Sequence, residues 1–342
     1  MMIMTSGLAL GIFFQNRQEY FANLHSQIQR QNLASAVTSH QLTQAILEAP
    51  SGFSPKPYVL LFAGDIMLSR AVGKKIQKAG DQNFPFLKIA DTIRSADFAF
   101  ANLENPISNH GSNQGSIYSF RADPKTAEGL TFAGFDAASI ANNHIWDWGS
   151  EALLDTINIL KEHHIIPLGA GKDFASANAP QFFTLGNTRL ALLAFTTLYP
   201  KSLEATAKTF GVSNPDLANI KSQIALARNE ADLVIVSLHW GDEYQTHSNR
   251  SQQQLARAII DSGANLVIGH HPHVLQEMEE YHGGYIFYSL GNFIFDQNFS
   301  EVTRLGGLAR VIIRHQKIES VEIIPIRIND QFQPEPATTS LP

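Results

Sequence analysis

The 342-residue sequence has no cysteine, little charge and no long hydrophobic run. The lack of cysteine excludes disulfides, thiolate zinc sites and cysteine nucleophiles. Charged residues make up only 16%, and the acidic and basic residues that give the net charge of −6 are interspersed. A protein that binds nucleic acid mainly through its phosphates needs a basic face, and no basic run is present. We therefore expect no nucleic-acid partner.

The apolar run at the N-terminus, residues 1–14 (MMIMTSGLALGIFF), is shorter than the ~20 residues that span a bilayer as a helix. It also lacks the basic start and the small-residue cleavage site of a good signal peptide. A membrane anchor, an export signal and a buried segment are the three interpretations, and we favour the first two together because polar sequence follows. The expected location is extracytoplasmic, with the chain either anchored in the membrane by its N-terminus or secreted.

Residues 15–57 are expected to form a helical stalk and a linker. Apolar residues recur there at roughly helical spacing, and the stretch APSGFSPKP then carries three prolines and a glycine. The main domain is predicted to cover residues 58–328. Residues 329–342, which include Pro334 and Pro336, are predicted to form a flexible tail.

Within the main domain, short apolar runs alternate with helical patterns, and hydrophobic residues make up 44% of the chain, as in a globular protein. Strands separated by helices of this length indicate an α/β fold with a buried, largely parallel sheet, to which hairpins add antiparallel strands. The predicted strands are 58–63, 98–101, 137–140, 165–168, 189–195, 233–238, 266–268 and 285–289. The predicted helices are 86–95, 124–133, 150–163, 215–229 and 251–262, and the predicted hairpins pair 182–185 with 189–195 and 308–314 with 318–326.

Polar clusters directly follow six of the apolar runs. The carboxyl ends of strands in an open α/β sheet line one edge, where ligands bind. We therefore expect the clusters to converge, although they are spread over more than 200 positions. They contain Asp65; Asn102 and Glu104; Asn142, Asn143 and His144; His239 and Glu243; His270, His271 and His273; and Asn292.

Carboxylate, imidazole and amide oxygen together suit a divalent ion such as Zn²⁺, Mn²⁺ or Fe²⁺. One or two such ions are expected, because a pair can hold both the attacking and the leaving oxygen of a displacement. His271 and His273, two positions apart, point to the same side if their segment is extended.

Each cluster taken alone also has a structural interpretation. Asp65 or Asn102 would more often be a turn former or a helix cap, and a lone His239 a hydrogen-bonded core residue. Six strand ends that all carry metal-competent groups are not expected from turn chemistry alone. For Asp147 two roles stay open, orienting His144 or capping the helix that starts near Gly149, and we favour the cap.

The blocks GDIMLSR, ANLENPI, SIANNHIWDWG, SLHWGDEY, GHHPHVLQ and YSLGNFIFD resemble, in this order, the CapA family of capsule-synthesis proteins, which is associated with poly-γ-glutamate. That family is itself similar to the calcineurin-like metallophosphoesterases. The resemblance covers about Tyr58 to Arg314. It implies a metallophosphoesterase-like αββα sandwich with mixed sheets flanked by helices.

The resemblance also implies roles for individual residues. His144 matches the histidine that contacts phosphoryl oxygens or the leaving group, and we pair it with Asp147 as the catalytic residues. Two positions depart from the metallophosphoesterase pattern, because Met67 stands in place of a histidine and Glu104 in place of an aspartate. The implied metal ligands are Asp65, Glu104, Asn143, His239, His271 and His273. The residues assigned to substrate binding are Asn102, Glu243, His270 and Asn292.

The expected function is that of a cell-envelope protein of poly-γ-glutamate synthesis or export with a metal-dependent, hydrolase-like site. Water activated by the metal would attack phosphorus or a carbonyl carbon, with His144 as general acid or orienting group. The expected partners are an anionic polymer such as poly-γ-glutamate or a phosphoester, together with membrane-embedded synthesis or export proteins. The alternatives are a non-catalytic protein of polymer binding or assembly with a degenerate metal site, and a true metallophosphatase.

Overall fold

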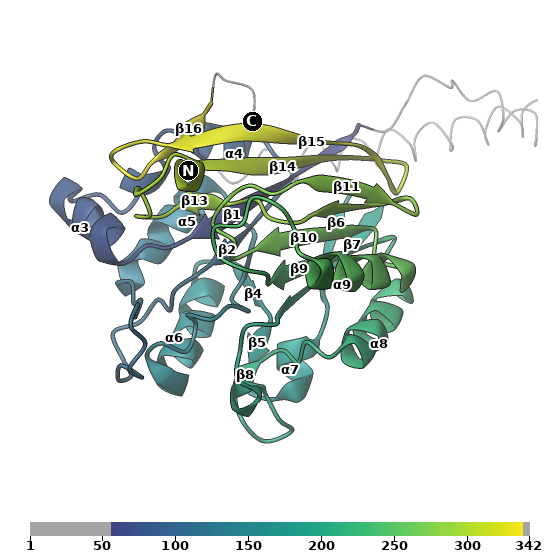
Figure 1. The fold of residues 1–342 in the computed structure, drawn as a ribbon, viewed down its shortest axis with the longest axis horizontal. Coiled ribbons are helices and arrows are strands. Elements are labelled where there is room, and N and C mark those ends of the chain that lie inside the picture. Colours follow the sequence, from purple (N-terminus) through teal and green to yellow (C-terminus); the bar gives the residue numbers. More distant parts are fainter. Residues whose placement is uncertain (1–55, 338–342) are drawn as a thin grey trace, which may run out of the picture. The chain divides into compact units, whose positions relative to one another are not determined.

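The computed structural model describes residues 56–337 of the chain. The predicted anchor or signal and nearly all of the predicted stalk and linker lie outside the described residues. Within residues 56–337, the strands form two large sheets and one small two-stranded sheet (Figure 1). None of the helices in this part of the chain combines the length and the hydropathy that crossing a membrane requires.

The first sheet has the order β16-β15-β14-β1-β2-β3-β4, with β13 also paired to β1. Strands β1 to β4 run parallel, and β14 to β16 add antiparallel pairs. The strands are β1 (Tyr58–Ile66), β2 (Phe98–Leu103), β3 (Ala137–Ser139), β4 (Ile166–Leu168), β13 (Asn292–Ile294), β14 (Leu305–Arg314), β15 (Lys317–Ile328) and β16 (Pro334–Pro336).

The second sheet has the order β11-β12-β10-β9-β7-β6, parallel from β12 to β7 and antiparallel at both edges. Its strands are β6 (Gln181–Leu185), β7 (Thr188–Thr196), β9 (Leu233–His239), β10 (Leu266–His270), β11 (Met278–Tyr281) and β12 (Gly284–Phe287). The small sheet pairs β5 (Ala170–Gly171) with β8 (Gly211–Val212). The parallel centres and both predicted hairpins, β6 with β7 and β14 with β15, are confirmed.

The α-helices are α3 (Arg70–Ala79), α4 (Ala90–Arg94), α5 (Ala127–Ala133), α6 (Gly149–Glu162), α7 (Phe174–Asn178), α8 (Leu217–Arg228) and α9 (Arg250–Asp261). Single 3₁₀ turns are η1 (Phe84–Phe86), η2 (Pro124–Thr126), η3 (Lys201–Leu203) and η4 (Val302–Arg304). The helix predicted at 86–95 is reduced to α4 preceded by η1, where Pro85 occupies the first turn. Helices α3 and α7 were not predicted.

Side chains alternate between two cores along each central strand, because successive residues of a strand point to opposite faces. Leu60 and Phe62 of β1 belong to the core between the sheets, whereas Leu61 belongs to the core under α3 to α6. In β7, Leu192 faces the other sheet and Leu193 faces α8 and α9. Burying each such side chain contributes about 1.5–3 kcal/mol to the free energy of folding. A shift of the strand register by one residue would turn these side chains to the opposite face and would therefore be strongly unfavourable.

The layers therefore run helices, sheet, sheet, helices, with α3 to α6 outside the first sheet and α8 and α9 outside the second (Figure 1). This is the predicted α/β sandwich with two mixed sheets flanked by helices.

The prediction of a flexible tail is wrong for residues 329–337, and its remaining part, residues 338–342, lies outside the described residues. Strand β16 pairs with β15 up to Pro336, opposite Ile326. The side chain of Phe332 is buried, and Nε2 of Gln333 donates to the carbonyl oxygen of Phe84 at 2.6 Å. The prolines that suggested a tail lie instead on an edge strand, where a missing N–H is tolerated.

Candidate metal centre

The polar clusters that follow the strands meet at one place. In the first sheet, Asp65 of β1 is in register with Asn102 of β2 and with Asn292 of β13. In the second sheet, His239 at the end of β9 is in register with His270 at the end of β10. Because both sheets present these strand ends to the same point, the structure brings the six clusters together as predicted.

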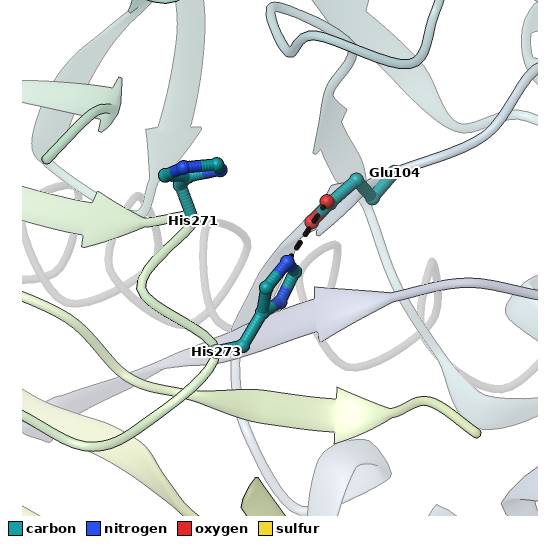
Figure 2. A group of neighbouring side chains, drawn as sticks. All are labelled: Glu104, His271 and His273. Carbon is teal, nitrogen blue, oxygen red and sulfur yellow. Dashed lines mark ion pairs between the residues drawn. The ribbon is translucent and has the colours of Figure 1, made fainter. Parts of the chain in front are cut away.

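Two groups of buried side chains could each hold a metal ion. Within each group, the ligand atoms all lie within 4.8 Å of one another, and Glu104 belongs to both groups. Figure 2 shows Glu104 and His273 pointing toward one another, with His273 Nε2 at 3.5 Å from Glu104 Oε1. The first group is Glu104, His271 and His273, and the second is Asp65, Glu104 and His239.

Several polar atoms in this cluster lack a hydrogen-bond partner. They are Glu104 Oε1, His271 Nδ1 and His270 Nε2, whereas His270 Nδ1 lies 3.4 Å from Asp65 Oδ1. Leaving a polar atom buried and unpaired costs about 1–3 kcal/mol, and more for a charged group. A cation bound among carboxylates and imidazoles would satisfy such atoms, and this donor set suits Zn²⁺, Mn²⁺ or Fe²⁺. The cluster thus fits a divalent metal site.

Amide side chains hold the two carboxylates in place. Nδ2 of Asn102 donates to Asp65 Oδ1 at 2.8 Å and to Glu104 Oε2 at 3.2 Å. Asn142 donates from Nδ2 to Asn102 Oδ1 at 3.1 Å. On the other side, Asn143 Oδ1 lies 2.8 Å from His239 Nε2, so the amide oxygen predicted to bind metal accepts from this histidine here.

The pKa values of the two carboxyl groups, Asp65 and Glu104, are shifted in opposite directions. Burial raises the pKa of Asp65, but hydrogen bonds and charge interactions with His270 and His273 outweigh it and bring the pKa well below the usual range. Burial, followed by the negative charge of Asp65, raises the pKa of Glu104 well above the usual range. Asp65 and Glu104 therefore differ in how strongly their surroundings favour the charged carboxylate.

The imidazoles of His239 and His271 are held neutral. Burial lowers the pKa of His239 well below the usual value, and the neighbouring His271 adds to this. Burial, with His273 nearby, lowers the pKa of His271 to about 3. A neutral imidazole has the free lone pair that metal ligation needs.

The backbone around His271 and His273 differs from the extended segment assumed for the sequence. Both residues have left-handed conformations, with φ of 95° and 59°. Such conformations cost about 1–3 kcal/mol in a non-glycine residue and persist where the surroundings enforce them. Both side chains nevertheless reach the cluster, with ring centroids 5.6 Å apart.

His144 forms a buried pair with Asp147, whose Oδ2 lies 2.8 Å from His144 Nδ1. The same carboxylate oxygen accepts a hydrogen bond from the backbone N–H of Phe120 at 2.7 Å. The favoured assignment of Asp147 as a helix cap is wrong, because the N-cap of α6 is Trp148 and shows no side-chain cap. The orienting role is the one that the contacts support.

A pocket of about 190 Å³ opens at this cluster, and we call it the site pocket. His144, His273 and Glu243 line it. The other three residues assigned to substrate binding are fully buried and do not line it: Asn102, His270 and Asn292. Lining residues that the sequence did not single out are Arg70, Tyr118, Phe120, Tyr244, Asp296, Gln297 and Phe299.

Three of these missed residues lie inside the quoted sequence blocks, Arg70 in GDIMLSR, Tyr244 in SLHWGDEY and Asp296 in YSLGNFIFD. Their position in one of these blocks was therefore the signal in the sequence that could have identified them as pocket residues. Tyr118, Phe120 and Phe299 lie outside the blocks and carried no signal.

Met67, two residues after Asp65, is part of the hydrophobic core under the helices. Its sulfur accepts hydrogen bonds from the backbone N–H of Ser69 at 3.2 Å and from its hydroxyl at 3.0 Å. Met67 therefore adds a packing contact to this region, and the ligand groups form without it.

The chain is similar to several known proteins. The family model described as bacterial capsule synthesis protein PGA_cap matches residues 59–297. The capsule biosynthesis protein CapA of Bacillus anthracis is 32% identical over 90% of this chain and 75% of its own length. The PGA biosynthesis protein CapA of Bacillus subtilis (strain 168) is 33% identical over 79% of this chain and 71% of its own length.

Among solved structures, a phosphatase from Mycoplasma pneumoniae superposes with a TM-score of 0.50 at 14% identity, covering 80% of this chain and 94% of its own. At this level of identity the likeness concerns the fold. It confirms the predicted metallophosphoesterase-like sandwich.

Proposed function

Since the chain belongs to the bacterial capsule synthesis family PGA_cap, we propose that it acts in the synthesis or export of poly-γ-glutamate and cleaves a bond of this polymer at a metal-dependent site. The observation that carries the hydrolytic part is the position of Glu104. Glu104 belongs to both groups of candidate metal ligands. These groups lie next to the site pocket, which His144 lines.

Asp65, Glu104, His239, His271 and His273 would hold the metal. When bound, a divalent ion supplies a Lewis acid that polarises a substrate oxygen and lowers the pKa of a water molecule. Asn102 and Asn142 keep the carboxylates oriented through their hydrogen bonds. Outer-sphere partners of this kind commonly change metal affinity 10–100-fold.

His144 handles the proton of the leaving group. Hydrolysis of a γ-glutamyl amide adds water across the C–N bond, and the departing amine must receive a proton. With His144 Nδ1 held by Asp147, the other ring nitrogen, Nε2, is the atom that gives this proton. The stack of His144 on Phe120, at 4.0 Å between ring centroids, limits rotation of the imidazole.

A non-catalytic role in polymer binding or assembly is the second candidate. The burial of Met67 in the core favours it, because this position offers no imidazole to a metal. A phosphoester is the alternative substrate of a hydrolytic site.

Metal analysis and hydrolysis assays test the proposal. Purified full-length protein should contain or take up Mn²⁺, Zn²⁺ or Fe²⁺ and hydrolyse γ-glutamyl oligopeptides more readily than a generic phosphodiester. His271→Ala should lower metal affinity and activity at least tenfold and reduce the rise in thermal midpoint on metal addition. His247→Ala, at an 88% exposed side chain outside the cluster, is the matched control.

The hydrolytic proposal fails if the protein binds no metal and His271→Ala alters neither activity nor thermal stability. Metal binding without hydrolysis of either substrate would favour the non-catalytic role.

We further propose that the protein works outside the cytoplasm, attached to the membrane by its N-terminus or secreted, with membrane-embedded synthesis or export proteins as partners. The apolar residues 1–14 and the membership of a capsule synthesis family support this location. Cell fractionation of the full-length chain and of a chain without residues 1–55 tests it.

A further inference from the structure

A second pocket, of about 450 Å³, shares Arg70 with the site pocket, and we call it the basic pocket. Its charged lining residues are Arg70, Lys74, Arg121, Asp123 and Lys125. Four cations thus line this pocket with one carboxylate, and one of the cations, Arg70, also pairs with Asp296, in a chain whose net charge is −6. The sign of this local charge is opposite to that of the protein.

Two short segments supply the cations. Arg70 and Lys74 are four residues apart in α3, so their side chains lie on the same face of the helix. Arg121 and Lys125 come from the segment that leads into α5. Asp123 accepts a hydrogen bond from the backbone N–H of Lys125 at 2.9 Å, so its carboxylate is partly engaged by the turn.

The cations differ in how they are held. The guanidinium of Arg121 lies 3.4 Å from the ring centroid of Trp148 and donates from Nη1 to the carbonyl oxygen of His110 at 3.4 Å. Lys74 and Lys125 are exposed, and neither forms an ion pair with any residue in the part of the chain that the structure describes. Their charges are therefore available to a ligand.

Arg70 connects the two pockets. It lies at the start of α3 with a left-handed φ of 52°, an unfavourable conformation for a residue other than glycine. Its guanidinium lies 3.1 Å from Asp296 and 5.3 Å from the ring centroid of Phe120, which itself stacks on His144. A chain of contacts thus runs from the basic pocket to the candidate catalytic histidine.

We propose that the basic pocket binds a stretch of a linear polycarboxylate whose adjoining part enters the site pocket past Arg70. The inference rests on the proposed function and names its substrate as a polymer chain rather than a single anionic unit. A small anion in the site pocket would leave the charges of Lys74 and Lys125 uncompensated. A chain with a carboxylate on every unit can meet both pockets at once.

Multivalency explains how exposed lysines can be sufficient to bind a polymer with repeated carboxylates. One exposed ion pair contributes little, at most about 1 kcal/mol. Repeated carboxylates on one chain turn each further contact into an intramolecular event, which raises the overall affinity well above that of any single contact. The arrangement should therefore discriminate polymer from monomer.

Binding measurements on the full-length chain in the presence of a chelator test the inference without depending on catalysis. The probes are a short poly-γ-glutamate oligomer, free glutamate and a DNA oligonucleotide of the same net charge. The double variant Lys74→Gln and Lys125→Gln should bind the oligomer about tenfold more weakly than wild type, with a shallower salt dependence. Lys208→Gln with Lys221→Gln, exposed lysines outside both pockets, is the matched control and should bind like wild type.

Equal oligomer affinity in the two double variants would overturn the inference while leaving the proposed function in place. An equal loss of affinity for free glutamate would also overturn it, because the basic pocket would then recognise a single carboxylate. The inference is also overturned if the oligonucleotide binds wild type as tightly as the oligomer does and loses as much affinity in the Lys74→Gln, Lys125→Gln variant. If wild type binds no poly-γ-glutamate either with the chelator or with added metal, the proposed function itself fails.

Discussion

The carboxylate of Asp147 makes two contacts through one oxygen, with the backbone N–H of Phe120 and with Nδ1 of His144. The first contact fixes the segment that carries Phe120 against His144. The second places the ring proton on Nδ1 and leaves Nε2 to exchange protons with a substrate. At the scale of the residue, we therefore propose that Asp147 is a positioning residue that acts through His144.

Replacement of Asp147 by asparagine should test this role. An amide is close to the carboxylate in size, but it can turn either its oxygen or its NH₂ group toward Nδ1, so it no longer enforces one tautomer of His144. We expect kcat for γ-glutamyl hydrolysis to fall roughly 10²–10⁴-fold, with metal content and KM little changed.

Asp155→Asn is the matched control, because Asp155 pairs with Nδ1 of the exposed His110 at 3.0 Å, outside both pockets. A fall in metal content or thermal midpoint that accounts for the lost activity of Asp147→Asn would contradict the positioning role.

At the scale of the element, the end of β1 is held by a close approach of two backbones. A Cβ on Gly64 would overlap the carbonyl oxygen of Gly291. The next residue, Asp65, donates its backbone N–H to that same oxygen at 3.0 Å. The missing side chain therefore lets β1 and the residue before β13 meet, and this contact sets the position of the Asp65 carboxylate.

Gly64→Ala should consequently destabilise the protein by about 1–3 kcal/mol, since the backbone has to move, and should weaken metal binding. Chemical denaturation and metal titration measure the two effects.

Gly283→Ala is the comparison, because Gly283 has a left-handed φ of 80° but no atom within 4 Å of the added Cβ. It should cost only about 1 kcal/mol and leave metal affinity unchanged. If the two variants behave alike, the close approach does not position Asp65.

At the scale of the whole molecule, the candidate centre joins the two sheets. Asp65 and Glu104 come from strand ends of the first sheet, whereas His239, His271 and His273 come from the second. A ligand that binds only this assembled state stabilises the entire fold by mass action, by about 2.7 kcal/mol at a hundred times Kd. Metal binding and global stability should therefore change together.

The location of the full-length chain is the prediction at this scale. We expect it in the membrane or extracellular fraction, because an apolar run and a family of capsule synthesis point outside the cytoplasm. A chain without residues 1–55 should remain in the cytoplasmic fraction and keep its metal affinity, since the ligands lie within residues 56–337. Full-length protein found only in the soluble cytoplasm would contradict the location.

The two-sheet sandwich was predicted from the family resemblance. The alternation of apolar runs with helical patterns was sufficient to predict an α/β fold, and the polar residues behind these runs were sufficient to predict the convergence of the site. Both depend on patterns within a few residues, since strand periodicity and strand ends are local properties. Asp65, Glu104 and His239 are predictable in this way, because each lies within a few residues of the end of an apolar run.

Other features depend on contacts between distant segments, which no local pattern encodes. The position of Phe120 against His144 depends on the hydrogen bond from the backbone N–H of Phe120 to Asp147, 27 residues away. The left-handed backbone at His271 and His273 is enforced by the surrounding packing. The sequence by itself determined which groups the strands carry. Only the tertiary structure decided which of them face a pocket and that Arg70 joins two pockets, because packing of both sheets and the loops places those side chains.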